Sequence, residues 1–137
     1  LFCGTLDCCK HPSYQDLEGL RVSSHFFIDR SGRLFQYVSC LDRAWHAGVS
    51  SYEGRENCND FSIGVELEGT DSAPYEQAQY ETLGRLTDAL AEAYPIKYVT
   101  GHSMIAPLRK TDPGPAFDWL TYESLCKTGK PLCFPYV

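Results

Sequence analysis

The strongest constraint on the fold of this chain is the segment 61–68, in which apolar side chains alternate with polar or small ones at every position. The apolar positions are Phe61, Ile63, Val65 and Leu67. Successive side chains of a β-strand point to opposite faces of the sheet, so these four residues share one face. The segment is therefore predicted to form a strand with one face in the core.

A hairpin is predicted before this strand. Residues 25–29 and 34–40 are rich in aromatic and β-branched residues, and they flank a turn sequence in which Gly32 is placed to adopt a positive φ. The stretch 41–60 contains many glycine, serine and asparagine residues, which is typical of a long functional loop.

Helices and a further strand are predicted after residue 68. An apolar stripe at helical spacing predicts a helix that Ser72 can cap and that ends before Pro95. A short strand at 97–100 and a helix at about 117–126 follow. This order predicts an α/β (α+β) fold with a mixed central β-sheet flanked by helices. With 137 residues, the chain is expected to form a single domain, 1–137.

Composition excludes several classes of function. A formal net charge of −6 argues against a nucleic-acid partner, which would require lysine and arginine to neutralise phosphates. The sequence shows neither an apolar run of about 18 residues nor a signal peptide, so no membrane partner is expected. The seven cysteines are an odd number and two of them are adjacent, which favours free thiols in a reducing compartment. Cys3, Cys8, Cys9 and His11 match no zinc-binding spacing that we can justify.

Three polar residues near the end of the predicted strand at 97–100 could carry chemistry. His102 follows the strand, and Asp112 lies ten residues further on across a loop. Pro113 disfavours a helical conformation at Asp112, so Lys110 and Asp112 should project the same way from an extended segment. A cation and a carboxylate would then face one site, although a histidine at a strand end and an aspartate before proline are often purely structural.

Two further candidates lie earlier in the chain. Glu66 is near the end of the 61–68 strand, and Gly64 on the same face leaves space for a ligand or for a close backbone approach. Without other information, a glutamate on a two-sided strand is more often a solvated carboxylate. Trp45 lies in the loop at 41–60, where it either packs on the core or offers a flat surface to a sugar or peptide.

Long runs of this sequence resemble one enzyme family over residues 1–125. The runs are RVSSH (21–25), RAWHAGVS (43–50), CNDFSIGVELEGTD (58–71) and KTDPGPAF (110–117). They are similar to the type 2 N-acetylmuramoyl-L-alanine amidases, and most of all to the cytoplasmic 1,6-anhydro-N-acetylmuramyl-L-alanine amidases. The fold of this family is shared with the peptidoglycan recognition proteins.

The resemblance implies a set of site residues. In this family Zn²⁺ is held by two histidines and one acidic or cysteine ligand, and His102 and Asp112 match the second histidine and the acidic ligand. Three protein ligands with an exchangeable water are typical of a catalytic zinc. Glu66 matches the general base and Lys110 the residue that stabilises the oxyanion. Arg21 and Trp45 match family positions that contact the substrate.

The sequence departs from the family pattern in two places. The first zinc-ligand histidine of the family lies upstream of the segment that resembles the start of this chain, so the resemblance implies a domain that lacks this ligand and its N-terminal strand. His11, His25 and His46 are the other histidines, and the last two match family positions that do not bind metal. At Asn57 the resemblance leads us to expect an arginine that binds carboxylates of the substrate.

Zinc-dependent hydrolysis of the amide bond between (anhydro-)N-acetylmuramic acid and L-alanine is the function that the resemblance implies. The substrate would be a small soluble muropeptide from peptidoglycan, and the role would be cell-wall recycling. Because one zinc ligand is not found, two alternatives stay open, a non-catalytic muropeptide-binding module and an inactive fragment.

Overall fold

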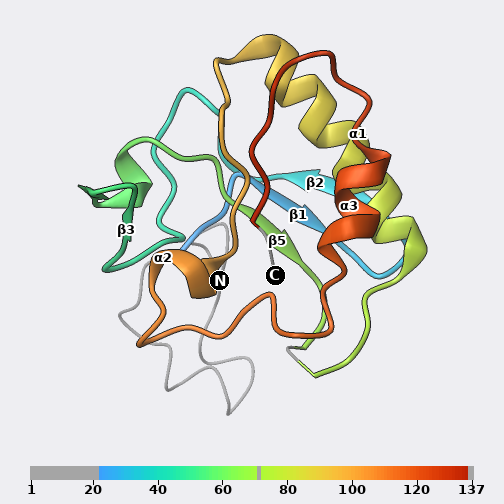
Figure 1. Cartoon of the computed structure of the whole chain (residues 1–137), viewed down its shortest axis with the longest axis horizontal. Coiled ribbons are helices and arrows are strands. Elements are labelled where there is room, and N and C mark those ends of the chain that lie inside the picture. Colours follow the sequence, from blue (N-terminus) through green and yellow to red (C-terminus); the bar gives the residue numbers. More distant parts are fainter. Residues whose placement is uncertain (1–21, 71, 136–137) are drawn as a thin grey trace.

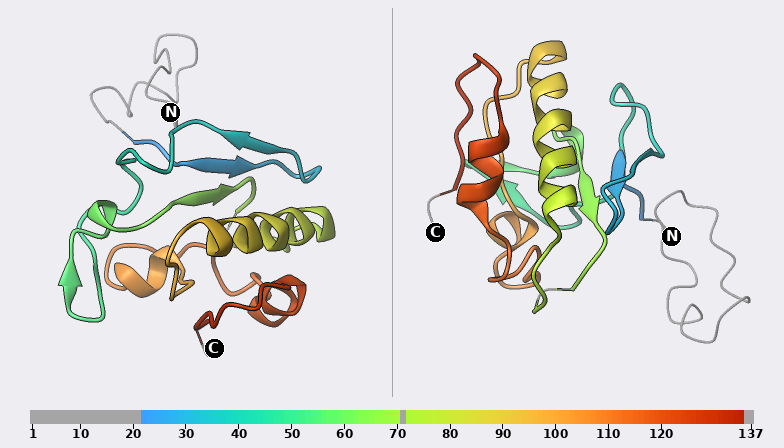
Figure 2. Two further views of the ribbon diagram at one scale, coloured as in Figure 1. Left: turned by 90° about the horizontal axis from the view of Figure 1, so that it is seen from above. Right: turned by 90° about the vertical axis from the view of Figure 1, so that its right-hand side faces the viewer.

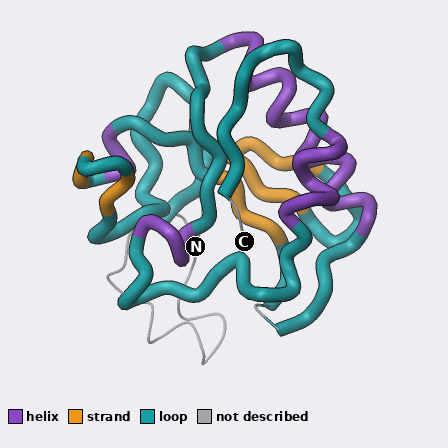
Figure 3. Tube along the Cα trace, viewed as in Figure 1, coloured by secondary structure: helices purple, strands orange, loops and turns teal. Residues whose placement is uncertain are grey.

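A computed structural model describes residues 22–70 and 72–135 (Figure 1). The strands are β1 (Phe26–Ile28), β2 (Leu34–Gln36), β3 (Ser51–Tyr52), β4 (Arg55–Glu56) and β5 (Val65–Leu67). The helices are the 3-10 helix η2 (Cys58–Asp60), α1 (Gln77–Ala93), α2 (His102–Ile105) and α3 (Trp119–Leu125). Loops connect most of these elements and make up much of the chain (Figure 3).

The central sheet has the strand order β2-β1-β5 and is mixed. β1 pairs antiparallel with β2 and parallel with β5, and Phe27 is the partner of Phe35 on one side and of Glu66 on the other. In both views of Figure 2, α1 lies between the sheet and α3. The predicted α+β fold with a mixed sheet is therefore confirmed. Strands β3 and β4 form a separate two-stranded hairpin.

The core forms where the sheet meets α1 and α3. Its buried residues come from β1, α1, α3 and the segment before α3, and Val65 and Leu67 of β5 pack against them. The predicted core face of the 61–68 segment is thus confirmed at these two positions. The buried members are Ile28, Tyr80, Leu83, Phe117, Trp119 and Tyr122.

Several predicted element bounds are wrong. The strand at 61–68 is confined to 65–67, because its preceding residues turn back on η2: Ser62 Oγ donates to the Cys58 carbonyl at 2.6 Å. The long helix begins after Glu76, not after Ser72. The Glu76 amide donates to the Gln79 side chain at 2.9 Å, which supplies the cap. The predicted strand at 97–100 is a single parallel bridge from Tyr98 to Cys133.

Other predicted elements are confirmed. The hairpin is present as β1 and β2, and Gly32 in its turn has φ 85°. The second helix is α3, within the expected range 117–126.

In the described part of the chain, none of the helices is long and apolar enough to cross a membrane. Cys40, Cys58, Cys126 and Cys133 are free thiols.

Candidate active site

His102 and Asp112 lie in contact at the start of α2. His102 is the first residue of the helix, and its Nδ1 is 3.2 Å from Asp112 Oδ2. The backbone strengthens this arrangement, since the Ser103 amide donates to the Asp112 carbonyl at 2.8 Å. The structure therefore brings together the two residues that the sequence analysis assigned to a metal.

The second nitrogen of His102 constrains what the first can do. Nε2 lies 2.9 Å from the carbonyl oxygen of Ala47, and a carbonyl can only accept, so Nε2 must carry the proton. A neutral His102 then presents a lone pair at Nδ1 to the carboxylate of Asp112. Two lone pairs at this separation need a positive charge between them. The pair is consequently suited to a proton or a metal ion.

The pKa values of His102 and Asp112 are shifted in the directions that favour a protonated imidazole beside an ionised carboxylate. The hydrogen bond that protonated His102 donates to the Asp112 carboxylate raises the pKa of His102 above its ordinary value, although burial opposes the change. The same bond lowers the pKa of Asp112. The His102 side chain is 19% exposed and that of Asp112 is 42% exposed, so the interaction between them is only partly screened by solvent.

The surroundings of Glu66 raise the pKa of its carboxyl group. It is the central residue of β5, and removal from solvent raises its pKa to about 7, with a further contribution from the negative charge of Asp112. The positive charges of His102 and Lys110 act in the opposite direction. A carboxyl group with this pKa can both take up and release a proton near pH 7, as a general base must.

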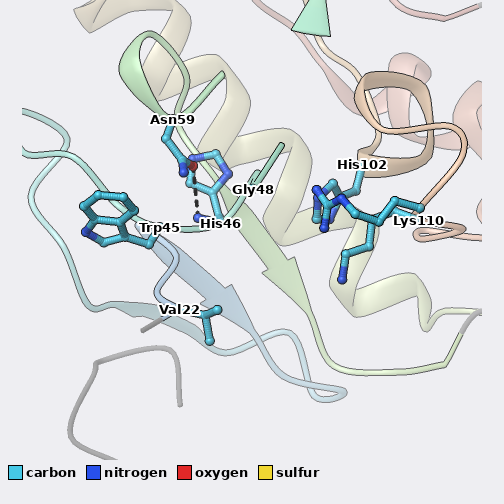
Figure 4. Close-up of a pocket in the computed structure, with 8 residues that line it drawn as sticks. Val22, Trp45, His46, Gly48, Asn59, His102 and Lys110 are labelled. Atoms are coloured by element: carbon cyan, nitrogen blue, oxygen red, sulfur yellow. Dashed lines mark hydrogen bonds between the residues drawn. The ribbon is translucent and has the colours of Figure 1, made fainter. Parts of the chain in front are cut away.

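A pocket of about 160 Å³ opens beside His102 (Figure 4). In Figure 4, His102 and Lys110 lie on one side of it, and Trp45 and Val22 come from the other. A cavity of roughly this volume holds one ring-sized group. A single portion of a ligand, such as one sugar ring, could therefore enter it. The lining residues are Val22, Trp45, His46, Gly48, Asn59, His102, Arg109 and Lys110.

Trp45 is anchored at the rim of the pocket. Its side chain is half-exposed, and the guanidinium of Arg43 stacks on the indole with its carbon 4.2 Å from the ring centroid. Asp60 fixes Arg43 through an ion pair of 3.1 Å. Trp45 therefore does not pack into the core, and it presents an aromatic surface next to the pocket.

Some lining residues were not singled out by the sequence analysis. Gly48 has φ 63°, and a Cβ there would lie 2.6 Å from Nη2 of Arg109, so the position favours glycine. The same Nη2 donates to the carbonyls of Ala47 and Val49. Asn59 also lines the pocket. The richness of the 41–60 loop in glycine and asparagine was the available signal, but it did not indicate individual residues.

One further sequence-based expectation is wrong, and the expectations for Asn57 and Arg21 stay predictions. The space beside Gly64 is taken by His46, whose ring would lie 2.5 Å from a Cβ at that position, so it is not open to a ligand. Asn57 is exposed at the start of η2 with φ 57° and does not line the pocket. Arg21 lies outside the described residues, as do Cys3, Cys8, Cys9 and His11.

In the part of the chain that the structure describes, His102 and Asp112 are the two candidate metal donors that lie together. Residues 22–70 and 72–135 contain no group of three or more histidine, cysteine, aspartate or glutamate side chains that could hold a metal ion. His102 and Asp112 nevertheless supply one nitrogen and one oxygen donor, both of which zinc accepts. They fit two of the three positions of a catalytic zinc.

This α+β fold brings a glutamate with a pKa near 7, an imidazole–carboxylate pair and a lysine within electrostatic reach of one another, and His102 and Lys110 of this group line the pocket. Hydrolysis of an acyl bond needs groups of these kinds. Residues 2–115 match the family model of the N-acetylmuramoyl-L-alanine amidases. The chain belongs to this family of hydrolases, which confirms the resemblance found in the sequence.

Known amidases are similar to this protein over most of its length. The 1,6-anhydro-N-acetylmuramyl-L-alanine amidase AmpD of Escherichia coli K12 is 57% identical over 127 residues, which are 91% of this chain and 69% of that protein. A crystal structure of a selenomethionine derivative of AmpD superposes with a TM-score of 0.84 at 54% identity, covering 90% of this chain and 70% of the other.

A more distant structure contains a ligand. It is the E. coli amidase AmiD in complex with the substrate anhydro-N-acetylmuramic acid-L-Ala-D-gamma-Glu-L-Lys. Its TM-score is 0.73 at 36% identity, and the match covers 83% of this chain and 51% of that one. Muropeptide binding is thus established for a protein of the same fold.

Proposed function

We propose that this protein hydrolyses the amide bond between the lactyl group of 1,6-anhydro-N-acetylmuramic acid and L-alanine in soluble muropeptides. The observation that carries the proposal is the placement of Glu66, with its pKa of about 7, beside the His102–Asp112 pair. The substrates named for AmpD and AmiD support this choice of bond. The role would be the recycling of cell-wall fragments in the cytoplasm.

Zinc is the cofactor that the site would use. His102 Nδ1 and an oxygen of Asp112 would hold it, and a third donor would come from outside the described residues. When bound, zinc lowers the pKa of a water and polarises the carbonyl under attack. The need for a positive charge between His102 and Asp112 supports this assignment.

The chain's own residues would move the proton and stabilise the developing charge. Glu66 accepts a proton from the attacking water, whose oxygen forms a bond to the lactyl carbonyl carbon. As the carbon–nitrogen bond breaks, Glu66 returns the proton to the nitrogen of L-alanine. Lys110, which lines the pocket, stabilises the negative charge on the carbonyl oxygen in the intermediate.

Substrate contacts are proposed for two residues. Trp45 would offer its exposed aromatic surface to the anhydro-sugar, and the ring-sized volume of the pocket fits this role. Arg21 would bind the stem peptide through its guanidinium, which suits carboxylates.

A non-catalytic muropeptide-binding module is the second candidate, favoured by the two donors found among the described residues. Zinc content separates the two functions. The enzyme should hold one zinc per chain, whereas a binding module should retain muropeptide without metal. Elemental analysis of the purified protein, before and after dialysis against a chelator, gives the stoichiometry.

Replacement of the proposed base tests the proposal directly. Glu66→Gln should lower kcat for an anhydro-muramyl peptide by about 10²–10⁴-fold, the usual contribution of a general base. Glu68→Gln is the matched control, because this glutamate is on the same segment but exposed, with its carboxylate accepting from the Arg30 amide at 3.0 Å. Equal activity of both variants and the unaltered protein would contradict the role of Glu66.

A further inference from the structure

Asn59 is a buried polar residue that lines the pocket and binds the backbone of the loop that carries Ala47. Its side chain is 7% exposed. The side-chain oxygen accepts two backbone hydrogen bonds, from the amide of His46 at 3.0 Å and from the amide of Ala47 at 2.8 Å. The first of these bonds is drawn in Figure 4. A single oxygen atom therefore fixes two successive peptide groups.

The carbonyl of Ala47 is the partner of the active-site histidine. It accepts from His102 Nε2 at 2.9 Å and from Arg109 Nη2 at 2.7 Å. Ala47 is itself buried, with 1% exposure. Its amide is bound to Asn59 and its carbonyl to His102, so the residue connects the two side chains. The position of the His102 ring depends on where this carbonyl points.

We propose that Asn59 is a positioning residue that fixes the ring orientation and the protonated nitrogen of His102 through the backbone of Ala47. Outer partners of this kind decide which ring nitrogen of a metal-binding histidine is left to coordinate. The inference rests on the proposed function in so far as His102 is taken to bind zinc. It extends that function to a residue that touches neither metal nor reacting atoms.

The amide side chain is suited to this task for a physical reason. One oxygen has two lone pairs, so Asn59 can satisfy both amides at once, and a buried amide left without a partner would destabilise this arrangement of the loop. Leucine at this position would keep the volume but remove the acceptor. Aspartate would keep the acceptor oxygen. The two substitutions therefore separate packing from hydrogen bonding.

Two measurements on Asn59→Leu test the proposal. Nitrogen-15 NMR of the metal-free protein should show a solvent-protected Nε2–H of His102 in the unaltered chain and in Asn59→Asp, and should show it lost or exchange-broadened in Asn59→Leu. Zinc affinity, measured by competition with a chromogenic chelator, should fall about 10–100-fold in Asn59→Leu. Thr87→Val is the control, because Thr87 is a buried polar residue whose hydroxyl contacts Leu83 and Tyr122, away from the site.

The outcomes are distinguishable. A folded Asn59→Leu with an unchanged Nε2–H signal and zinc affinity within twofold of the unaltered protein would overturn the inference. So would a folded Asn59→Asp that loses the signal, which covers the case in which the leucine variant does not fold. If the unaltered protein shows the signal but binds no zinc, the proposed function fails while the positioning of His102 stands.

Discussion

His46 shows how the site environment keeps a titratable side chain neutral. Its ring packs on Gly64 and meets His25 edge to face, with 5.7 Å between the ring centroids. Burial lowers its pKa to about 4, and electrostatic interactions with the imidazoles of His25 and His102 act in the same direction. His46 is therefore uncharged at neutral pH and leaves the positive charges at the pocket to its neighbours.

The pH dependence of stability should reveal this shift. Well above pH 6.5, His46 is unprotonated in both the folded and the unfolded state. As the pH falls from 6.5 through 4, the unfolded state binds a proton that the folded state does not, so the free energy of unfolding decreases by up to about 3 kcal/mol. Urea denaturation between pH 4 and 7 measures this change.

His46→Phe is the matched variant, since it keeps a ring against Gly64 but cannot titrate. Its unfolding free energy, subtracted from that of the unaltered protein at each pH, isolates the contribution of residue 46. A difference that stays constant from pH 4 to 7 would show that the pKa of His46 is not lowered.

At the scale of elements, aromatic rings join the helices to the segment that precedes α3. Phe117 lies at the centre of this cluster, with its ring centroid 5.3 Å from that of Tyr80 in α1 and 4.7 Å from that of Trp119 in α3. Tyr75, just before α1, is 5.6 Å away and donates from its hydroxyl to the Pro113 carbonyl at 3.0 Å. The cluster thereby also supports the loop that carries Asp112.

Phe117→Ala should lower the free energy of unfolding by about 3–5 kcal/mol, because it removes a buried ring and leaves a cavity. Leu120→Ala is the control from the adjacent helix, where the side chain is 79% exposed and its removal should change stability by less than about 0.5 kcal/mol. Thermal and chemical denaturation provide both values. A loss below 1 kcal/mol in Phe117→Ala would mean that the ring is not part of a packed core.

The types of most elements could be predicted from the sequence, but several of their ends could not. The alternation at 61–68 indicates a strand correctly, yet periodicity does not reveal that Ser62 bonds back to Cys58 and shortens it. Likewise, Ser72 is a suitable cap by residue type, but the helix begins after Glu76, whose amide is satisfied by Gln79. Ends depend on hydrogen bonds that local patterns leave undetermined.

At the scale of the whole molecule, the site is assembled from segments far apart in the sequence. Glu66 and Asp112 could be named from the sequence because they lie in runs that resemble the amidase family, and His102 because it follows the predicted strand at 97–100 and matches a family ligand. The contact between His102 and the Ala47 carbonyl joins residues 55 positions apart. Because a backbone carbonyl is present at every residue, no sequence pattern distinguishes the one that orients His102.

The central claim is that these groups together hydrolyse the lactyl–L-alanine amide bond. Mass spectrometry of the products formed from an anhydro-muramyl tripeptide in oxygen-18 water, with zinc present, tests it most directly. We predict free tripeptide and anhydro-N-acetylmuramic acid with one oxygen-18 atom in its lactyl carboxylate, since hydrolysis places the oxygen of water on the carbonyl carbon. Intact substrate after incubation with protein that holds one zinc per chain would contradict the claim.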